Sequence, residues 1–275
     1  MPGRAILSLS NRNEGVGRTE CIARNGSHTP LPHRMPDNLV SYFQSGDSIR
    51  SRSVGKVTLS GILDVPTPPA RLTADWEREI SASRLGLEPG DVQALPLARA
   101  RARWPDYRHC VQAVRDWTRT LGLPAEVLAS GDVALMACRG ARYHHDGAQY
   151  GGAAFCNLFL SEDKGLDVHF PSTGHRIPLA RGTVVLFDTC QPHAVIRRRS
   201  GGFEVADFAP GLDCTQVFLT WELPVADANV AHALGVAFDV DPLTASLQLD
   251  EEQVWLNGTR AMVCPDTGRW CPAAY

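Results

Sequence analysis

The feature that most constrains the fold is a succession of short apolar segments between Asp132 and Leu223, separated by turns rich in glycine or proline. The segments read DVALMACRGARYHHD, AAFCNLFL, LDVHFP, HRIPLA, TVVLFDT, HAVIRRR, FEVADF and TQVFLTWEL. Short strands that recur about every 8–12 residues are typical of sandwiches and barrels. We therefore expect a mainly β protein with N-terminal helices (α+β), whose strands form a double-stranded β-helix, or jelly-roll, barrel.

Helical patterns precede these strands. The segment TADWEREISASRLGL opens on Thr73, a possible N-cap, and ends near Gly86. In DYRHCVQAVRDWTRTLGL apolar residues recur at spacings of three and four, with Asp106 as N-cap and Gly122 at the end. We expect both helices to buttress one sheet, within about residues 70–125. Before them, Val54 to Val65 alternates like a strand.

The chain of 275 residues is long enough for one large core. We expect a single domain over residues 35–275, with a barrel core at about 133–223 and a C-terminal cover at 224–275. Within this cover, the stretch from Phe238 to Tyr275 indicates a helix and a hairpin. Residues 1–34 are rich in Gly, Ser, Asn, Arg and Pro and show no apolar period, so we expect a disordered leader.

Charge and apolar pattern exclude several classes of function. The net charge is −3, and no basic stripe interleaves with aromatic residues, so nucleic acid is not an expected partner. No apolar run reaches the roughly 20 residues of a spanning helix, and no signal peptide is recognisable, so we expect a cytoplasmic protein without membrane contact. Arginine strongly outnumbers lysine, which is typical of a GC-rich bacterial genome. A small molecule, amino acid or peptide is the expected substrate.

Two stretches hold most of the candidate metal ligands, YHHDG and DTCQPHAVIRRR. On a strand, His144 and Asp146 share one face and His145 points away. His193 is the natural third ligand, because the 47 residues that separate it from Asp146 allow four intervening strands. Two histidines and a carboxylate form a facial triad that leaves metal positions open for substrate and oxygen.

The motif H-x-D, followed by GTVVLFDT and PHAV, resembles the Fe(II)/2-oxoglutarate-dependent oxygenase superfamily over about Val133 to Leu223. The resemblance implies that His144, Asp146 and His193 bind Fe(II) and that 2-oxoglutarate and O2 are co-substrates. It also implies a dioxygenase that couples oxidative decarboxylation of 2-oxoglutarate to succinate with oxidation of a second substrate. Hydroxylation is the usual outcome, and desaturation, cyclisation and halogenation are the others.

Members of this superfamily bind the far carboxylate of 2-oxoglutarate with an arginine or lysine on the last barrel strand. The corresponding stretch here, Gln216 to Trp221, has no basic residue. Arg197 and Arg199 share parity with His193, and a guanidinium suits a carboxylate, so we expect one of them to replace it. Tyr143 and Asn157 are further candidates for hydrogen bonds to the co-substrate.

Three alternatives stay open on the sequence. His145 and Gly147 give the H-x-G pattern of iron halogenases, in which chloride takes the place of the carboxylate. A cupin-like barrel could bind a metal or ligand without oxidative activity. A hydrolase would use Cys156 or Cys190 as nucleophile, but no motif for a reactive serine or cysteine is present, and the scattered cysteines are expected to be buried free thiols.

Overall fold

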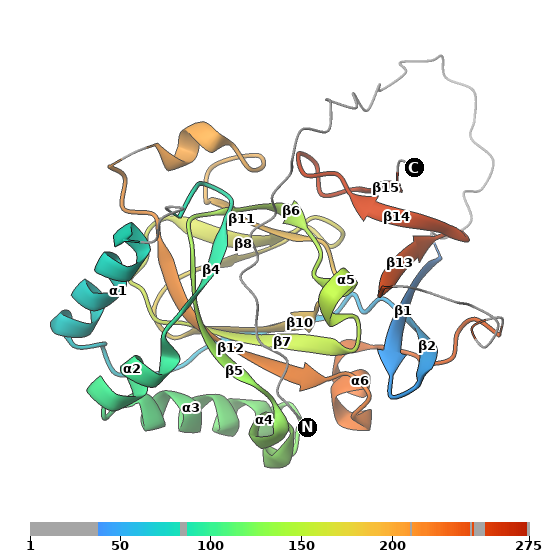
Figure 1. Cartoon of the computed structure of the whole chain (residues 1–275), viewed down its shortest axis with the longest axis horizontal. Helices are drawn as coiled ribbons and strands as arrows, with labels where there is room; N and C mark the ends of the chain where they lie inside the picture. The colour runs from blue at the N-terminus through green and yellow to red at the C-terminus, as the bar shows by residue number, and fades with distance from the viewer. Residues whose placement is uncertain (1–37, 83–86, 210, 243, 245–250, 274–275) are drawn as a thin grey trace.

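The computed structural model describes residues 38–82, 87–209, 211–242, 244 and 251–273 (Figure 1). The expected leader, residues 1–34, and the expected helix end at Gly86 lie outside the described residues.

Eight consecutive strands form two facing antiparallel sheets. They are β5 (Val133–Cys138), β6 (Ala141–His144), β7 (Ala153–Phe159), β8 (Leu166–Phe170), β9 (His175–Pro178), β10 (Thr183–Asp188), β11 (His193–Arg197) and β12 (Gln216–Pro224). Two further strands, β3 (Thr58–Ile62) and β4 (Val92–Leu95), lie at the edges of the larger sheet. That sheet has the order β3-β10-β7-β12-β5-β4, and the other has the order β6-β11-β8-β9. Apart from the β8–β9 hairpin, successive strands from β5 to β12 alternate between the sheets, and β5 pairs with β12, which is jelly-roll connectivity. The sheets share no hydrogen-bonded strand pair among the described residues.

Strand alternation divides the apolar residues between two cores. Along β12, Val217, Leu219 and Trp221 are buried against the helices on the outer face of the larger sheet. Phe218, between them, belongs to the core that lies between the two sheets. Because side chains of a strand point alternately to its two faces, each strand of this sheet serves both cores. The larger sheet is therefore covered on both sides, and the space between the sheets holds the candidate site.

Four helices cover the outer face of the larger sheet, at its left and below it in Figure 1. They are α1 (Ala70–Ala82), α2 (Leu97–Arg103), α3 (Tyr107–Thr120) and α4 (Ala125–Ser130). The helix predicted from Thr73 begins earlier, at Ala70, because Pro68 and Pro69 fix its entry. The Thr73 hydroxyl instead donates to the carbonyl of Ala70 inside the helix.

Helix α3 begins and ends close to the residues predicted from the sequence, Asp106 and Gly122. Asp106 occupies the N-cap position, although its side chain makes no capping hydrogen bond. After the helix, Gly122 has a φ of +80°, the left-handed conformation that glycine adopts without strain.

A third sheet joins the two ends of the described chain. Its strands are β1 (Leu39–Ser45), β2 (Ser48–Ser53), β13 (Gln253–Leu256), β14 (Thr259–Val263) and β15 (Trp270–Pro272), in the order β15-β14-β13-β1-β2. The β1–β2 hairpin was not predicted from the sequence. The strand predicted at Val54–Val65 contains β3 (Thr58–Ile62), and no strand was predicted at β4 (Val92–Leu95).

The C-terminal segment holds a helix and a hairpin, but the helix lies before Phe238, where the stretch predicted to contain both begins. The helix is α6 (Ala228–Leu234), capped by the Asp227 carboxylate, which accepts from the amides of Asn229 and Val230. The hairpin joins β13 to β14 through Asn257 and Gly258, both with positive φ. Consecutive residues with positive φ match the twist of a two-residue hairpin turn.

Within the described ranges, none of the helices has both the length and the apolar character needed to span a bilayer.

The two faces of β12 give a testable contrast. Leu219 is fully buried between sheet and helices, so Leu219→Ala should lower the free energy of unfolding by about 2–5 kcal/mol. Thr220 faces the cavity between the sheets, so Thr220→Ala should cost about 1 kcal/mol or less. Urea unfolding of both variants checks this, and equal losses would contradict the assignment of faces.

Candidate metal centre

Two strands of the smaller sheet bring the two histidines together. His144 is the last residue of β6 and His193 the first of β11, and the two strands pair so that His144 lies opposite His193. The register shifts between His193 and Val195, which is a β-bulge or irregularity. Bulges re-aim side chains and occur often beside functional sites. The two imidazole rings lie with centroids 4.4 Å apart.

Asp146 reaches the histidines from a turn, not from a strand. It has an α-helical conformation, with φ −95° and ψ 0°, and stands at the N-cap of the short helix α5 (Gly147–Tyr150). Its backbone amide donates to the carbonyl of Thr189, at 2.8 Å, which ties it to the turn after β10. Strand parity therefore explains His144 but not Asp146, because the strand has ended before that residue.

The Asp146 carboxylate is available for a metal. Aspartate at an N-cap usually accepts a hydrogen bond from the helix amides, but this side chain makes no capping bond. One carboxylate oxygen lies 3.7 Å from Nε2 of His144, and the other lies 3.6 Å from Nε2 of His193. The side chain is almost completely buried, at 5% exposure, so it needs a charged or hydrogen-bonding partner.

Hydrogen bonds to the backbone fix which nitrogen of each histidine faces the carboxylate. Nδ1 of His144 lies 2.7 Å from the carbonyl of Arg142, and Nδ1 of His193 lies 3.0 Å from the carbonyl of Gln191. A carbonyl only accepts, so each Nδ1 carries the proton and each Nε2 lone pair is free for a metal. Such bonds orient metal-binding histidines in proteins generally.

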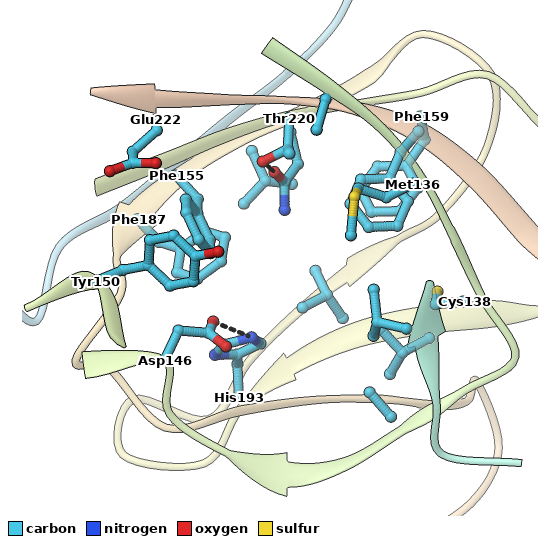
Figure 2. Close-up of a pocket in the computed structure, with 18 of the residues that line it drawn as sticks. Met136, Cys138, Asp146, Tyr150, Phe155, Phe159, Phe187, His193, Thr220 and Glu222 are labelled. Carbon is cyan, nitrogen blue, oxygen red and sulfur yellow. Dashed lines mark hydrogen bonds and ion pairs between the residues drawn. The ribbon is translucent and has the colours of Figure 1, made fainter. Parts of the chain in front are cut away.

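One ligand atom from each of the three residues can be chosen so that all lie within 4.8 Å of one another. His144, Asp146 and His193 are thus close enough to hold one metal ion together. Two imidazoles and one carboxylate are ligands that would suit iron(II). Figure 2 shows Asp146 and His193 side by side at one end of that cavity.

Burial keeps the imidazole of His193 neutral. Desolvation is the largest cause that lowers the pKa of His193, to about 4, and the neighbouring His144 lowers it further. The ring centroids of Phe187 and Phe170 lie 4.8 and 6.0 Å from the centroid of the His193 ring, and both rings form part of this apolar environment. A neutral imidazole is the form that binds a metal, so His193 does not have to lose a proton at neutral pH.

The cavity lies between the two sheets and encloses about 930 Å³ of empty space, part of it open to solvent. Its wall is largely apolar, as Figure 2 shows, and includes Phe187 beside His193 and, farther from the triad, Met136, Phe159 and Phe218. The polar groups opposite the triad are few. Asn157 on β7 and Thr220 on β12 meet there, and the Thr220 hydroxyl donates to Oδ1 of Asn157 at 2.5 Å.

No lysine or arginine lines this cavity among the residues that the structure describes. Arg197 is held elsewhere, because its guanidinium donates to the carbonyls of Asp207 and Lys164. Arg199 follows the end of β11 and is exposed. Neither arginine therefore occupies the position expected for a co-substrate anchor. Parity fails because the strand ends at Arg197 and the chain turns away.

Tyr143 and Asn157 have different surroundings. Tyr143 is buried on the other face of β6, where its hydroxyl lies 2.6 Å from Nδ1 of His169, so it does not line the cavity. Asn157 does line the cavity. Of the residues suggested for the co-substrate, only Asn157 shares a cavity with the triad.

His145 takes no part in the candidate site. Its ring packs against Trp270 at a centroid distance of 4.9 Å, and its Nδ1 accepts from the amide of Gly147. Burial lowers its pKa to about 4. Gly147 has no room for a side chain, because a Cβ there would lie 2.4 Å from Sγ of Cys190. The H-x-G register of an iron halogenase is therefore not the one that gathers at the cavity.

The described cysteines are all free thiols. Cys156 and Cys190 are fully buried, and burial raises the pKa of both, that of Cys190 to about 12. A protonated, inaccessible thiol is a poor nucleophile, which disfavours the cysteine hydrolase alternative.

Several lining residues were missed from sequence. Tyr150 on α5 and Glu222 on β12 line one side of the cavity, with Tyr150 nearer to Asp146, and Figure 2 shows the Tyr150 hydroxyl aimed into the cavity. Strand parity on β12 could have found Glu222, because it shares a face with Phe218 and Thr220. No sequence signal marks Tyr150, whose position depends on the turn at Asp146.

No protein-family model matches the chain, and no curated protein matches it. Among solved structures, one match is viral collagen prolyl hydroxylase from Paramecium Bursaria Chlorella virus-1 in complex with 2OG, at 12% identity and a TM-score of 0.32, over 61% of this chain and 96% of that one. Another is SnoN, a non-heme alpha ketoglutarate dependent epimerase from nogalamycin biosynthesis, at 14% identity and a TM-score of 0.34, over 62% and 78%. Vicilin from Corylus avellana matches at 16% identity and a TM-score of 0.23, over 38% and 25%. TM-scores this low assign no function, so the chemistry of the site rests on its own geometry.

Metal binding separates the roles of His193 and His145. His193→Ala should abolish tight binding of one Fe(II) or Co(II) per chain, because it removes one of three ligands. His145→Ala, the matched control, should leave the stoichiometry unchanged. Anaerobic titration followed by visible absorption of Co(II) measures both, and loss of binding in His145→Ala alone would reverse the assignment.

Proposed function

We propose that this protein is a non-haem Fe(II) oxygenase that uses 2-oxoglutarate and O2 to oxidise a largely apolar substrate. The observation that carries the proposal is the triad of His144, Asp146 and His193 at the end of a jelly-roll cavity. A metal held by three protein ligands keeps positions for exogenous ligands, which a purely structural site does not need. The sequence resemblance supports the same chemistry.

The chain's own residues would hold the metal in a defined orientation. Nε2 of each histidine and the Asp146 carboxylate would supply three ligands, and the backbone carbonyls that accept from Nδ1 keep the rings in place. Iron(II) at this position would supply oxygen activation. Phe187 and Phe170 pack against the His193 ring and would keep water away from that side of the imidazole.

The cavity offers 2-oxoglutarate neutral hydrogen-bond donors in place of a cation. We propose that the amide of Asn157, oriented by its bond to Thr220, binds the far carboxylate. A neutral donor contributes about 0.5–1.5 kcal/mol, against about 1.5–3 kcal/mol for a charged one. The affinity for 2-oxoglutarate should therefore be weak for an enzyme of this class.

The remaining wall favours an apolar substrate group. Met136, Phe159 and Phe218 provide no partner for a charge, and burial of an unpaired charge is costly. An aliphatic or aromatic group that fills this part of the cavity would gain about 25 cal/mol for each Å² of apolar surface it buries. We propose hydroxylation as the outcome, on a small molecule or on an apolar amino-acid or peptide side chain.

The test is consumption of O2 and formation of succinate by the iron-loaded protein. The wild type should form succinate only when Fe(II), 2-oxoglutarate and O2 are all present, even without substrate, since uncoupled turnover occurs in such sites. Asp146→Ala should abolish succinate formation. Tight iron binding without any succinate would favour the alternative, a metal-binding barrel without oxidative activity, and full activity of Asp146→Ala would refute the site.

Asn157 provides a sharper test of the co-substrate. Asn157→Leu should raise the half-saturating concentration of 2-oxoglutarate about tenfold, the loss of one hydrogen bond worth about 1.4 kcal/mol. Cys138→Ala, at another position of the same cavity, should leave it unchanged. Succinate formation across a range of 2-oxoglutarate concentrations measures both variants. An unchanged value in Asn157→Leu would place the far carboxylate elsewhere.

A further inference from the structure

A fully buried arginine lies behind the metal centre, on a strand outside the jelly roll. Arg52 belongs to β2 and its side chain has no exposure to solvent. Its guanidinium forms a two-pronged ion pair with Asp188, with both N–O distances 2.7 Å. Asp188 ends β10 and is equally buried. An arginine of this kind is rarely buried unless it is paired, so its position needs an explanation.

The partner carboxylate organises the turn that follows β10. Asp188 accepts from the amide of Cys190 at 2.9 Å and from the amide of Gly55 at 2.6 Å. Its carbonyl accepts from the amide of Gln191 at 2.8 Å. The turn from Asp188 to Gln191 is thus folded around this one side chain and fastened to the strand that carries Arg52.

That turn makes the contacts that orient two metal ligands. The carbonyl of Thr189 accepts from the amide of Asp146, and the carbonyl of Gln191 accepts from Nδ1 of His193. The Thr189 hydroxyl also donates to the carbonyl of Tyr150, at 2.6 Å. A displacement of the turn would therefore move the carboxylate and rotate the imidazole together.

Arg52 also holds the other side of the site directly. Its Nε donates to the carbonyl of Gly151 at 2.7 Å, just after the helix that Asp146 begins. One guanidinium thus connects the segment that carries Asp146 to the turn that precedes His193. Its planar fork of donors serves both at once, which the single ammonium of a lysine cannot do with the same geometry.

We propose that Arg52 is a positioning residue of the metal centre, acting through Asp188 and Gly151 on Asp146 and His193. The inference rests on the proposed metal site. Burying an ion pair contributes little net stability, since loss of hydration offsets most of the attraction. Its effect here is on geometry: it holds two ligands from separate segments at the spacing one ion requires. Arg52 itself does not line the cavity and touches none of the reacting groups.

The test compares Arg52 with its neighbour on the same strand. Arg50 pairs with Asp239 at 2.9 Å in an exposed position, so Arg50→Met is the matched control for loss of an arginine ion pair on β2. The variants Arg52→Lys and Asp188→Asn weaken the buried pair without leaving a large cavity. Anaerobic titration with Co(II) alone gives the affinity, and the visible spectrum at saturation reports the geometry around the ion.

Arg50→Met should bind Co(II) as the wild type does. Arg52→Lys and Asp188→Asn should bind it about 10–100-fold more weakly, with an altered spectrum at saturation. Urea unfolding of the metal-free variants shows whether they still fold cooperatively. The double variant Arg52→Met with Asp188→Asn removes the unpaired buried charge, so it should regain stability relative to Arg52→Met and still bind Co(II) weakly.

The following results would contradict the proposed role of Arg52 or the proposed metal site. A cooperatively folded Arg52 variant with the affinity and spectrum of the wild type would overturn the positioning role. Affinity that returns with stability in the double variant would show that Arg52 is only structural. Failure of the wild type to bind Co(II) or Fe(II) would instead contradict the proposed function.

Discussion

The candidate site depends on the antiparallel pairing of β6 with β11, which places His144 opposite His193. These residues lie far apart in sequence, and jelly-roll connectivity makes their strands neighbours because the intervening strands are divided between the two sheets. The pairing fixes the distance between two imidazoles before any metal arrives. A ligand set assembled in this way loses little conformational freedom on binding an ion, since the backbone has already been ordered by folding.

The third candidate ligand, Asp146, is positioned by a turn, whereas the two histidines are positioned by strands. Asp146 leaves the sheet, begins α5 and is held by the carbonyl of Thr189. Its carboxylate, free of a capping role, then lies between the two Nε2 atoms. Glycine at position 147 lets the chain pass against Cys190 at a distance that no side chain would tolerate. The precision of the site is therefore a property of backbone contacts as much as of the three ligands.

Most of the strand segments could be predicted from the sequence because each is bounded by glycine or proline and carries an apolar core face. FEVADF was wrong, because it holds no strand and its last four residues form the 3-10 helix η1 (Val205–Phe208). The four strands expected between Asp146 and His193 are β7 to β10. The arginine expected at the cavity was not there, because parity ceases to apply where a strand ends, and Arg197 stands at that end. The β1–β2 hairpin was not predicted because the sequence of β2, SIRSRS, is polar and shows no alternation of apolar residues. The burial of the hairpin also depends on the long-range pairing of β1 with β13. The polar pair of Asn157 and Thr220 likewise exists only when β7 and β12 lie side by side.

The buried arginine on β2 lies outside the part of the chain that carries the candidate metal ligands. All three candidate ligands lie within residues 133–224, which hold the eight jelly-roll strands β5 to β12. The side chain that connects their supporting segments comes from Arg52, well outside that stretch. A fragment trimmed to the eight jelly-roll strands would keep every ligand and lose the connection between them. Transferring this centre to another jelly roll, or shortening the chain for expression, would therefore require that the β1–β2 hairpin be retained together with the jelly-roll strands.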